Sequence, residues 1–190
     1  MRVLWLLVTA IIVNTPALAE NLKVRIDGDR LRVSGDAIHF LTGRPLDRLH
    51  NGAVVTYVLQ LTVRAERAGR VLSRLAERFT FSYDLWEEKF AVTKQGVPSR
   101  SASNLSPSGA ESWCLDNLSI PAAQVPADRN VWLSVDYESE EPKDAAPNSD
   151  SPLTLGTLID IFSRRPRNDQ QVHGSVEIGP VSLDELRKKK

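Results

Sequence analysis

Two long runs of alternating apolar and polar residues follow one another in this 190-residue chain. The first, residues 54–64, places five apolar side chains on one side: Val55, Tyr57, Leu59, Leu61 and Val63. The second, residues 70–83, follows a turn near Gly69 and aligns Val71, Leu75, Phe79 and Phe81. A period of two residues is typical of a strand with one buried face, so the two runs predict an antiparallel hairpin. Ser73 and Glu77 interrupt the apolar side of the second run, and a helix over residues 71–77 is the alternative.

Shorter segments continue the strand pattern. Strands are predicted at residues 22–26, 31–33, 86–92, 131–137 and 172–178. Asp27-Gly28-Asp29 joins the first two as a tight hairpin. In the third, Trp86, Phe90 and Val92 are in phase. Residues 93–107 are rich in Ser, Gly and Pro and predict a loop, as do the acidic residues 138–150.

Capping signals predict three short helices. Ser108 and Glu111 have the spacing of a capping box, and apolar residues behind them recur at helical spacing up to Leu118, before Pro121. Ser151-Pro152 is a start signal for a second helix, which extends to about Phe162. Ser182 and Glu185 form another capping box, which leads into the basic tail at residues 187–190.

These elements predict a mainly β fold. Sequential hairpins favour antiparallel sheets packed in a sandwich-like way, with two or three short helices. No alternation of strands with long helices and no internal repeat is present in the sequence. We expect one β-rich domain over residues 20–190.

Residues 1–19 have the layout of a secretory signal peptide. Arg2 precedes an apolar run at residues 3–13, and Ala17-Leu18-Ala19 is an A-x-A cleavage site. The run is about half the ~20 residues that a spanning helix needs, and no later segment is long and apolar enough. We therefore expect cleavage before Glu20, a periplasmic or secreted location and no transmembrane segment afterwards. A retained anchor is the alternative.

The composition limits the chemistry of the chain. It holds 24 basic and 24 acidic residues, a balance that disfavours a nucleic-acid partner. Cys114 is the single cysteine, so a monomer forms no disulfide, and its place on an apolar helix face predicts burial. His39, His50 and His173 lack the spacing of metal ligands. We expect neither a metal site nor a cofactor.

Arginines concentrate on the predicted central hairpin. If the strand phase holds, Arg64, Arg74 and Arg78 share its exposed face. Such a face predicts binding to a protein or to an anionic component of the envelope. Glu66 and Glu77 reduce the local charge, and an ordinary solvated surface is the alternative.

Two carboxylates near Trp86 are the catalytic candidates. On a strand, Asp84 and Glu88 fall on the same side as Trp86, and Glu87 points to the other. Glycosidases use a pair of carboxylates as their catalytic groups, so a carboxylate pair beside an aromatic ring is typical of such a site. The simpler interpretation is a turn residue and a solvated strand edge, because charged strand residues usually face water.

The order of several segments carries a family resemblance. The segment from Leu46 to Gly52 precedes a long strand with an arginine near its end, then FSYDLWEEKFAVT from Phe81, then a helix ending in LDNL. From Asp36 to Tyr137 the chain resembles a family of exported bacterial proteins catalogued only as a domain of unknown function. The resemblance implies an envelope location and brings no activity or catalytic residue.

We therefore expect a non-enzymatic binding or interaction module of the bacterial envelope. One alternative is an envelope hydrolase for glycan or ester bonds that uses carboxylates near Trp86. The other is a carrier of a lipid or other apolar ligand inside the sandwich. The oligomeric state stays open.

Overall fold

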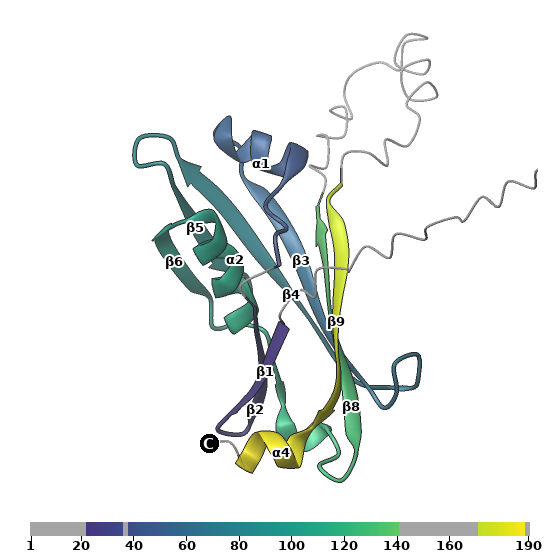
Figure 1. Cartoon of the computed structure of the whole chain (residues 1–190). Helices are drawn as coiled ribbons and strands as arrows, with labels where there is room; N and C mark the ends of the chain where they lie inside the picture. Colours follow the sequence, from purple (N-terminus) through teal and green to yellow (C-terminus); the bar gives the residue numbers. More distant parts are fainter. Residues whose placement is uncertain (1–21, 36–37, 141–170, 189–190) are drawn as a thin grey trace, which may run out of the picture.

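The computed structural model describes residues 22–35, 38–140 and 171–188, shown in colour in Figure 1. Their strands form two antiparallel sheets, with the orders β1-β2-β7 and β6-β5-β4-β3-β8-β9. Buried residues of both sheets belong to one hydrophobic core. The predicted mainly β, antiparallel, sandwich-like architecture is confirmed. The leader and the predicted helix at residues 151–162 lie outside the described residues.

The elements have the following bounds. The three-stranded sheet holds β1 (Leu22–Asp27), β2 (Arg30–Gly35) and β7 (Ser119–Pro121). The six-stranded sheet holds β3 (Val55–Arg64), β4 (Val71–Asp84), β5 (Lys89–Lys94), β6 (Arg100–Leu105), β8 (Asn130–Ser139) and β9 (His173–Ser182). The helices are α1 (Gly43–His50), α2 (Pro107–Asp116), the 3-10 helix η1 (Ala122–Gln124) and α4 (Leu183–Lys188).

The β3–β4 hairpin is the centre of the larger sheet, and the alternation predicted it correctly. Residues paired across it include Val55 with Phe81 and Leu61 with Leu75. The apolar row of β3 is almost fully buried, and burial of each such side chain stabilises the fold by roughly 1.5–3 kcal/mol. The helix alternative for residues 71–77 is wrong, because residues 71 and 73–77 pair with β3.

The β4–β5 connection corrects the predicted third strand. β5 begins at Lys89, and Trp86 lies in the turn before it. Asp84 Oδ1 accepts hydrogen bonds from the backbone amides of Trp86 at 2.8 Å and Glu87 at 3.1 Å. Glu88 adopts a positive φ of 53°. These local hydrogen bonds favour a turn over a continued strand.

The predicted loop at residues 93–107 contains the edge strand β6. Its sequence, RSASNL, holds residues with little intrinsic preference for strands, so no propensity signal marked it. The next helix, α2, starts at Pro107 and has Ser106 as its N-cap, whose side chain accepts from the Gly109 amide at 3.1 Å. The capping box predicted at Ser108 is therefore wrong by two residues.

Glu111, the other half of that predicted box, has a different partner. Its side chain is buried, and its Oε1 accepts from the backbone amides of Phe40 at 2.7 Å and Leu41 at 2.8 Å. Oε2 lies 3.1 Å from His39 Nδ1. One carboxylate therefore fixes the segment between β2 and α1 onto α2. The Phe40 ring then packs on Tyr57, with centroids 5.0 Å apart.

The C-terminal strand is longer than predicted. β9 continues past Gly179 and Pro180 to Ser182, and its partner β8 shifts register between Val131 and Leu133. The final helix, α4, follows as expected and buries Leu183. Within the described part of the chain, no helix has the length and apolarity needed to cross a bilayer.

We expect Glu111→Ala to lower the free energy of unfolding by about 2–4 kcal/mol, because it leaves two buried amide groups without an acceptor. Urea denaturation monitored by circular dichroism measures the change. Glu87→Ala, at an exposed position in the β4–β5 turn, is the control and should change stability by less than about 0.5 kcal/mol. Equal effects of the two substitutions would contradict the anchoring role of Glu111.

Candidate functional site

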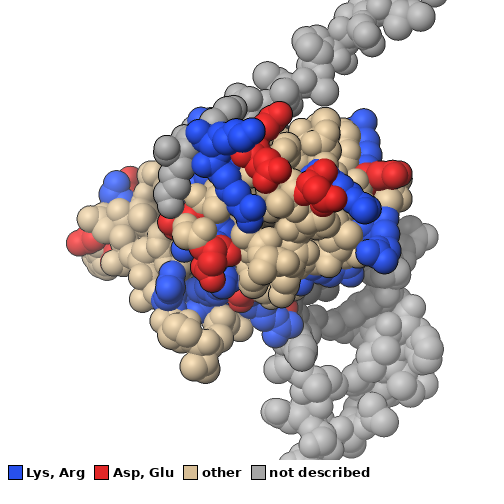
Figure 2. Space-filling view, turned by 90° about the horizontal axis from the view of Figure 1, so that it is seen from below, with Lys and Arg blue, Asp and Glu red and all other residues tan. Residues whose placement is uncertain are grey.

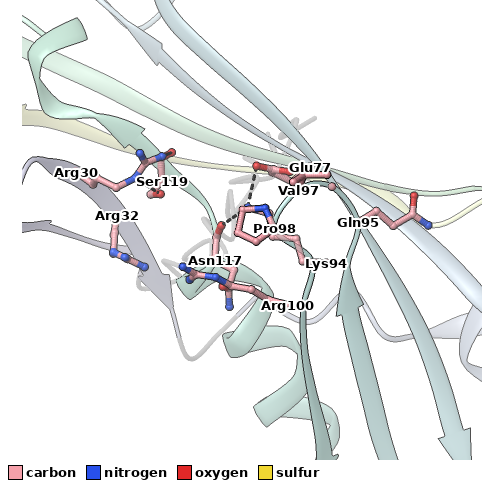
Figure 3. A pocket seen from close by; sticks show the side chains of 11 residues that line it. Arg30, Arg32, Glu77, Lys94, Gln95, Val97, Pro98, Arg100, Asn117 and Ser119 are labelled. Carbon is pink, nitrogen blue, oxygen red and sulfur yellow. Dashed lines mark hydrogen bonds and ion pairs between the residues drawn. The ribbon is translucent and has the colours of Figure 1, made fainter.

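A pocket of about 250 Å³ lies where the two sheets meet beside the end of α2 (Figure 3). We call it the basic pocket, after four of its lining residues: Arg30, Arg32, Lys94 and Arg100. Glu77 is the acidic residue of the lining. Four positive charges against one negative charge give this small volume a net charge of about +3.

Arg30 and Arg32 come from β2, where they alternate with the buried Leu31. Arg30 donates from Nε to Ser119 Oγ and from Nη2 to the Ser119 carbonyl, each at 2.7 Å. Because these bonds join β2 to β7, they hold Arg30 in place and use part of its donor capacity. Figure 3 shows the side chains of Arg30 and Ser119 next to each other.

Arg32 extends toward the C-terminal end of α2. Its Nη1 donates to the Asp116 carbonyl at 2.8 Å. A helix C-terminus carries a partial negative charge, so the contact is favourable. Arg32 Nε lies 3.0 Å from Asp27 Oδ2, within ion-pair distance, but this buried atom has no aligned hydrogen-bond acceptor. Arg32 therefore retains unused donor capacity.

The opposite wall comes from the inward-facing rows of β4 and β5. Away from the β4–β5 turn, each row first has two buried apolar residues. These are Phe81 and Phe79 on β4, and Phe90 and Val92 on β5. The next inward positions are Glu77 and Lys94, which form an ion pair of 2.8 Å. Lys94 Nζ also donates to the Asn117 carbonyl at 3.2 Å (Figure 3). On β4 and β5 the fully buried apolar residues give way to the lining of the basic pocket at these two positions.

Arg100 is the first residue of β6, and its side chain is exposed. In Figure 3 it extends toward Asn117 and Arg32. Among the described residues it has no hydrogen-bond or ion-pair partner. Its guanidinium therefore presents five donors in a planar fork, the geometry that pairs with a carboxylate or phosphate.

The arrangement suits an anion better than an apolar ligand. Charged and polar groups form most of the lining, and the apolar Val97 and Pro98 lie in the loop before β6. Seen from below, positive and negative side chains intermix over the surface of the molecule (Figure 2). On that face no single sign of charge prevails, whereas the basic pocket gathers positive charge locally.

The three arginines predicted as a binding face lie elsewhere. The register pairs Arg74 with Thr62 and Arg78 with Val58, on the side of β3 opposite its buried row. Arg64 lies on that same outer side and donates to Ser134 Oγ at 3.2 Å.

Two of these three arginines are already engaged. Arg78 Nη2 is 2.7 Å from Glu140 Oε1, and Arg64 has its serine partner. None of the three lines the basic pocket. They share a sheet face, as the phase predicted, without converging on a common point: Arg74 and Arg78 are four positions apart on one strand, about 13 Å.

The predicted catalytic carboxylates lie at the exposed β4–β5 turn. Asp84 and Glu88 are both exposed, and Trp86 is 95% exposed. Asp84 uses one oxygen to hold the turn. Neither carboxylate lines the basic pocket.

Other chemistry-bearing residues lie apart from the pocket. No group of three or more His, Cys, Asp or Glu in residues 22–35, 38–140 and 171–188 could hold a metal ion. Cys114 is fully buried in α2, as predicted. Burial, and then the charge of Glu111, raise the pKa of its thiol well above the ordinary value.

No protein-family model, no curated protein and no solved structure matches this chain. The resemblance to an exported family of unknown function stays a prediction.

Sequence reasoning missed the basic pocket, although one signal was visible. Glu77 is a charged residue in phase with a buried row, and the pattern flagged it only as an imperfection. Lys94 has the same relation to Phe90 and Val92, but lay inside the predicted loop. Arg30 and Arg32 matched a solvated strand face, because sequence alone does not say what lies opposite them.

We expect the native Cys114 thiol to react with iodoacetamide at pH 8 more than about tenfold slower than the thiol of the urea-unfolded chain. Its raised pKa means that the unfolded chain forms thiolate first. Because the folded state favours the protonated thiol, burial of Cys114 contributes to the free energy of unfolding in full below about pH 8.5. The contribution declines as the pH rises above that value. Mass spectrometry of alkylated protein measures the rate, and Cys114→Ala is the blank. Equal rates in the two states would contradict burial of the thiol.

Proposed function

We propose that this chain is an exported, non-enzymatic binding protein that holds an anionic group of its ligand in the basic pocket. The observation that carries the proposal is the convergence of Arg32, Lys94 and Arg100 on one pocket, where Arg100 has no partner among residues 22–35, 38–140 and 171–188. Arg30 is held by Ser119 and adds positive charge to the same wall.

The state of the donors supports binding of an added anion. Lys94 is neutralised by Glu77 within the pocket, and both side chains are about one-fifth exposed. Arg32 is partly compensated by Asp27, whose Oδ2 lies 3.0 Å from its Nε, whereas Arg100 has no hydrogen-bond or ion-pair partner among the described residues. An oxyanion would accept charge-assisted hydrogen bonds, which contribute roughly 1.5–3 kcal/mol each. Because the pocket is open to solvent, a simple anion should bind weakly and with strong dependence on ionic strength.

Export is the second part of the proposal, and it is supported by the leader at residues 1–19. A periplasmic or secreted location also agrees with a chain whose one cysteine is buried, since an oxidising compartment leaves such a thiol unchanged. The resemblance to exported bacterial proteins points to the same compartment.

We expect acetate and inorganic phosphate to shift the backbone amide resonances of residues 94–100 and 117–119 when titrated at constant ionic strength. Arg100→Gln should raise the dissociation constant at least about fivefold, because it removes the free guanidinium. Arg74→Gln is the matched control, since Arg74 lies outside the pocket on the outer face of the sheet. Shifts confined to other surfaces, or equal effects of the two variants, would overturn the assignment.

We expect the mature protein from the native host to begin at Glu20. Intact mass spectrometry of the purified protein, with N-terminal sequencing, measures this directly. Ala17→Asp and Ala19→Asp together should block cleavage, because small residues are required at both positions. If the protein without these substitutions is recovered with residues 1–19 still attached, cleavage is contradicted and the anchored alternative is favoured.

A further inference from the structure

The strand β6 borders the basic pocket and forms one edge of the six-stranded sheet. In the described part of the chain, β6 pairs with β5 and with no other strand. Most of its residues are exposed. An edge strand presents backbone amide and carbonyl groups that can pair with another extended chain.

We propose that the ligand is a short extended peptide segment, which pairs antiparallel with β6 and places its C-terminal carboxylate in the basic pocket. The inference rests on the proposed function, because it names the class of ligand for the same pocket. Addition of a strand to a sheet edge and capture of a terminal carboxylate are both known modes of peptide recognition.

The direction of β6 selects the C-terminus of the ligand. β6 starts at Arg100 beside the pocket and runs away from it toward Leu105. A strand that pairs antiparallel with β6 therefore ends at Arg100. Every strand pair of both sheets is antiparallel, so the added strand would continue the existing pattern.

The donor geometry of the pocket accommodates a carboxylate. A carboxylate is planar and accepts two parallel hydrogen bonds from a guanidinium such as that of Arg100. The exposed Val97 and Pro98 lie beside the carboxylate position and offer an apolar contact for the last side chain of the ligand.

The length of β6 limits the ligand to about four residues. Asn104 has a positive φ of 59°, which interrupts the extended backbone. The β5–β6 register also shifts between Phe90 and Val92. Regular pairing is thus confined to residues 100–103, about 13 Å of strand. Such a short polar edge resists indiscriminate pairing, and the carboxylate supplies the additional anchor.

Fluorescence polarisation tests the proposal with the full chain that follows residue 19. The probe is the peptide Thr-Val-Thr-Val-Thr, labelled at its N-terminus and made with either a free C-terminal carboxylate or a C-terminal amide. We expect the free acid to bind at least about tenfold more tightly than the amide. Arg100→Gln should remove this difference, and Arg74→Gln should preserve it. No preference for the acid, or a preference that survives Arg100→Gln, overturns the proposal.

N-methylation of the peptide tests the strand pairing without altering the protein. In an antiparallel pair, alternate amides point toward the partner strand. Of two probes methylated at adjacent amides, one should lose binding and the other should bind nearly normally. If neither methylation weakens binding, the ligand does not pair with β6 and the inference is overturned.

Simple anions separate the inference from the proposed function. If acetate binds in the basic pocket and the peptide acid binds no more tightly than acetate, the proposed function stands and the peptide ligand is excluded. If neither acetate nor phosphate binds there, and the peptide acid does not bind, both proposals fail. Peptide binding that acetate competes away supports both.

Discussion

The carboxylate of Glu111 is the contact on which the arrangement of α2 depends. Its two hydrogen bonds to the amides of Phe40 and Leu41 join segments about 70 residues apart in the chain. A buried carboxylate is costly unless hydrogen bonds satisfy it, so α2 has one favourable position against this segment. The C-terminal end of α2 then presents the carbonyls of Asp116 and Asn117. They accept hydrogen bonds from Arg32 of one sheet and Lys94 of the other.

Alternation of apolar and polar residues predicted the strands whose two faces differ in environment. The β3–β4 hairpin is the clearest case, because its buried row excludes any other register. β6 lacked this contrast, since both of its faces are largely exposed and its residues are small and polar. Glu111 shows the opposite failure. Its spacing from Ser108 satisfied a local helix-start motif, yet its partners lie far away in sequence, which a local pattern cannot report.

The basic pocket was hard to predict for a related reason. Its four cations come from β2, β5 and β6, and each has an ordinary local interpretation as a solvated or loop residue. The prediction instead favoured Arg64, Arg74 and Arg78, which are close in sequence and share a strand face. Arginines on one hairpin face do not converge on a point, because alternate residues of a strand lie about 7 Å apart, whereas the basic pocket draws its cations from three separate strands.

Glu77 and Lys94 connect the fold with the proposed site. They occupy inward positions where two apolar residues would extend the core, and an ion pair there adds little net stability because desolvation offsets much of the attraction. The pair does, however, follow the fully buried apolar residues of β4 and β5 and supply two charged groups to the lining of the basic pocket. Since Glu77 balances Lys94, the pocket's excess charge resides mainly on the arginines. Their planar guanidinium groups favour a ligand whose acceptor oxygens match the guanidinium geometry over loosely held counterions.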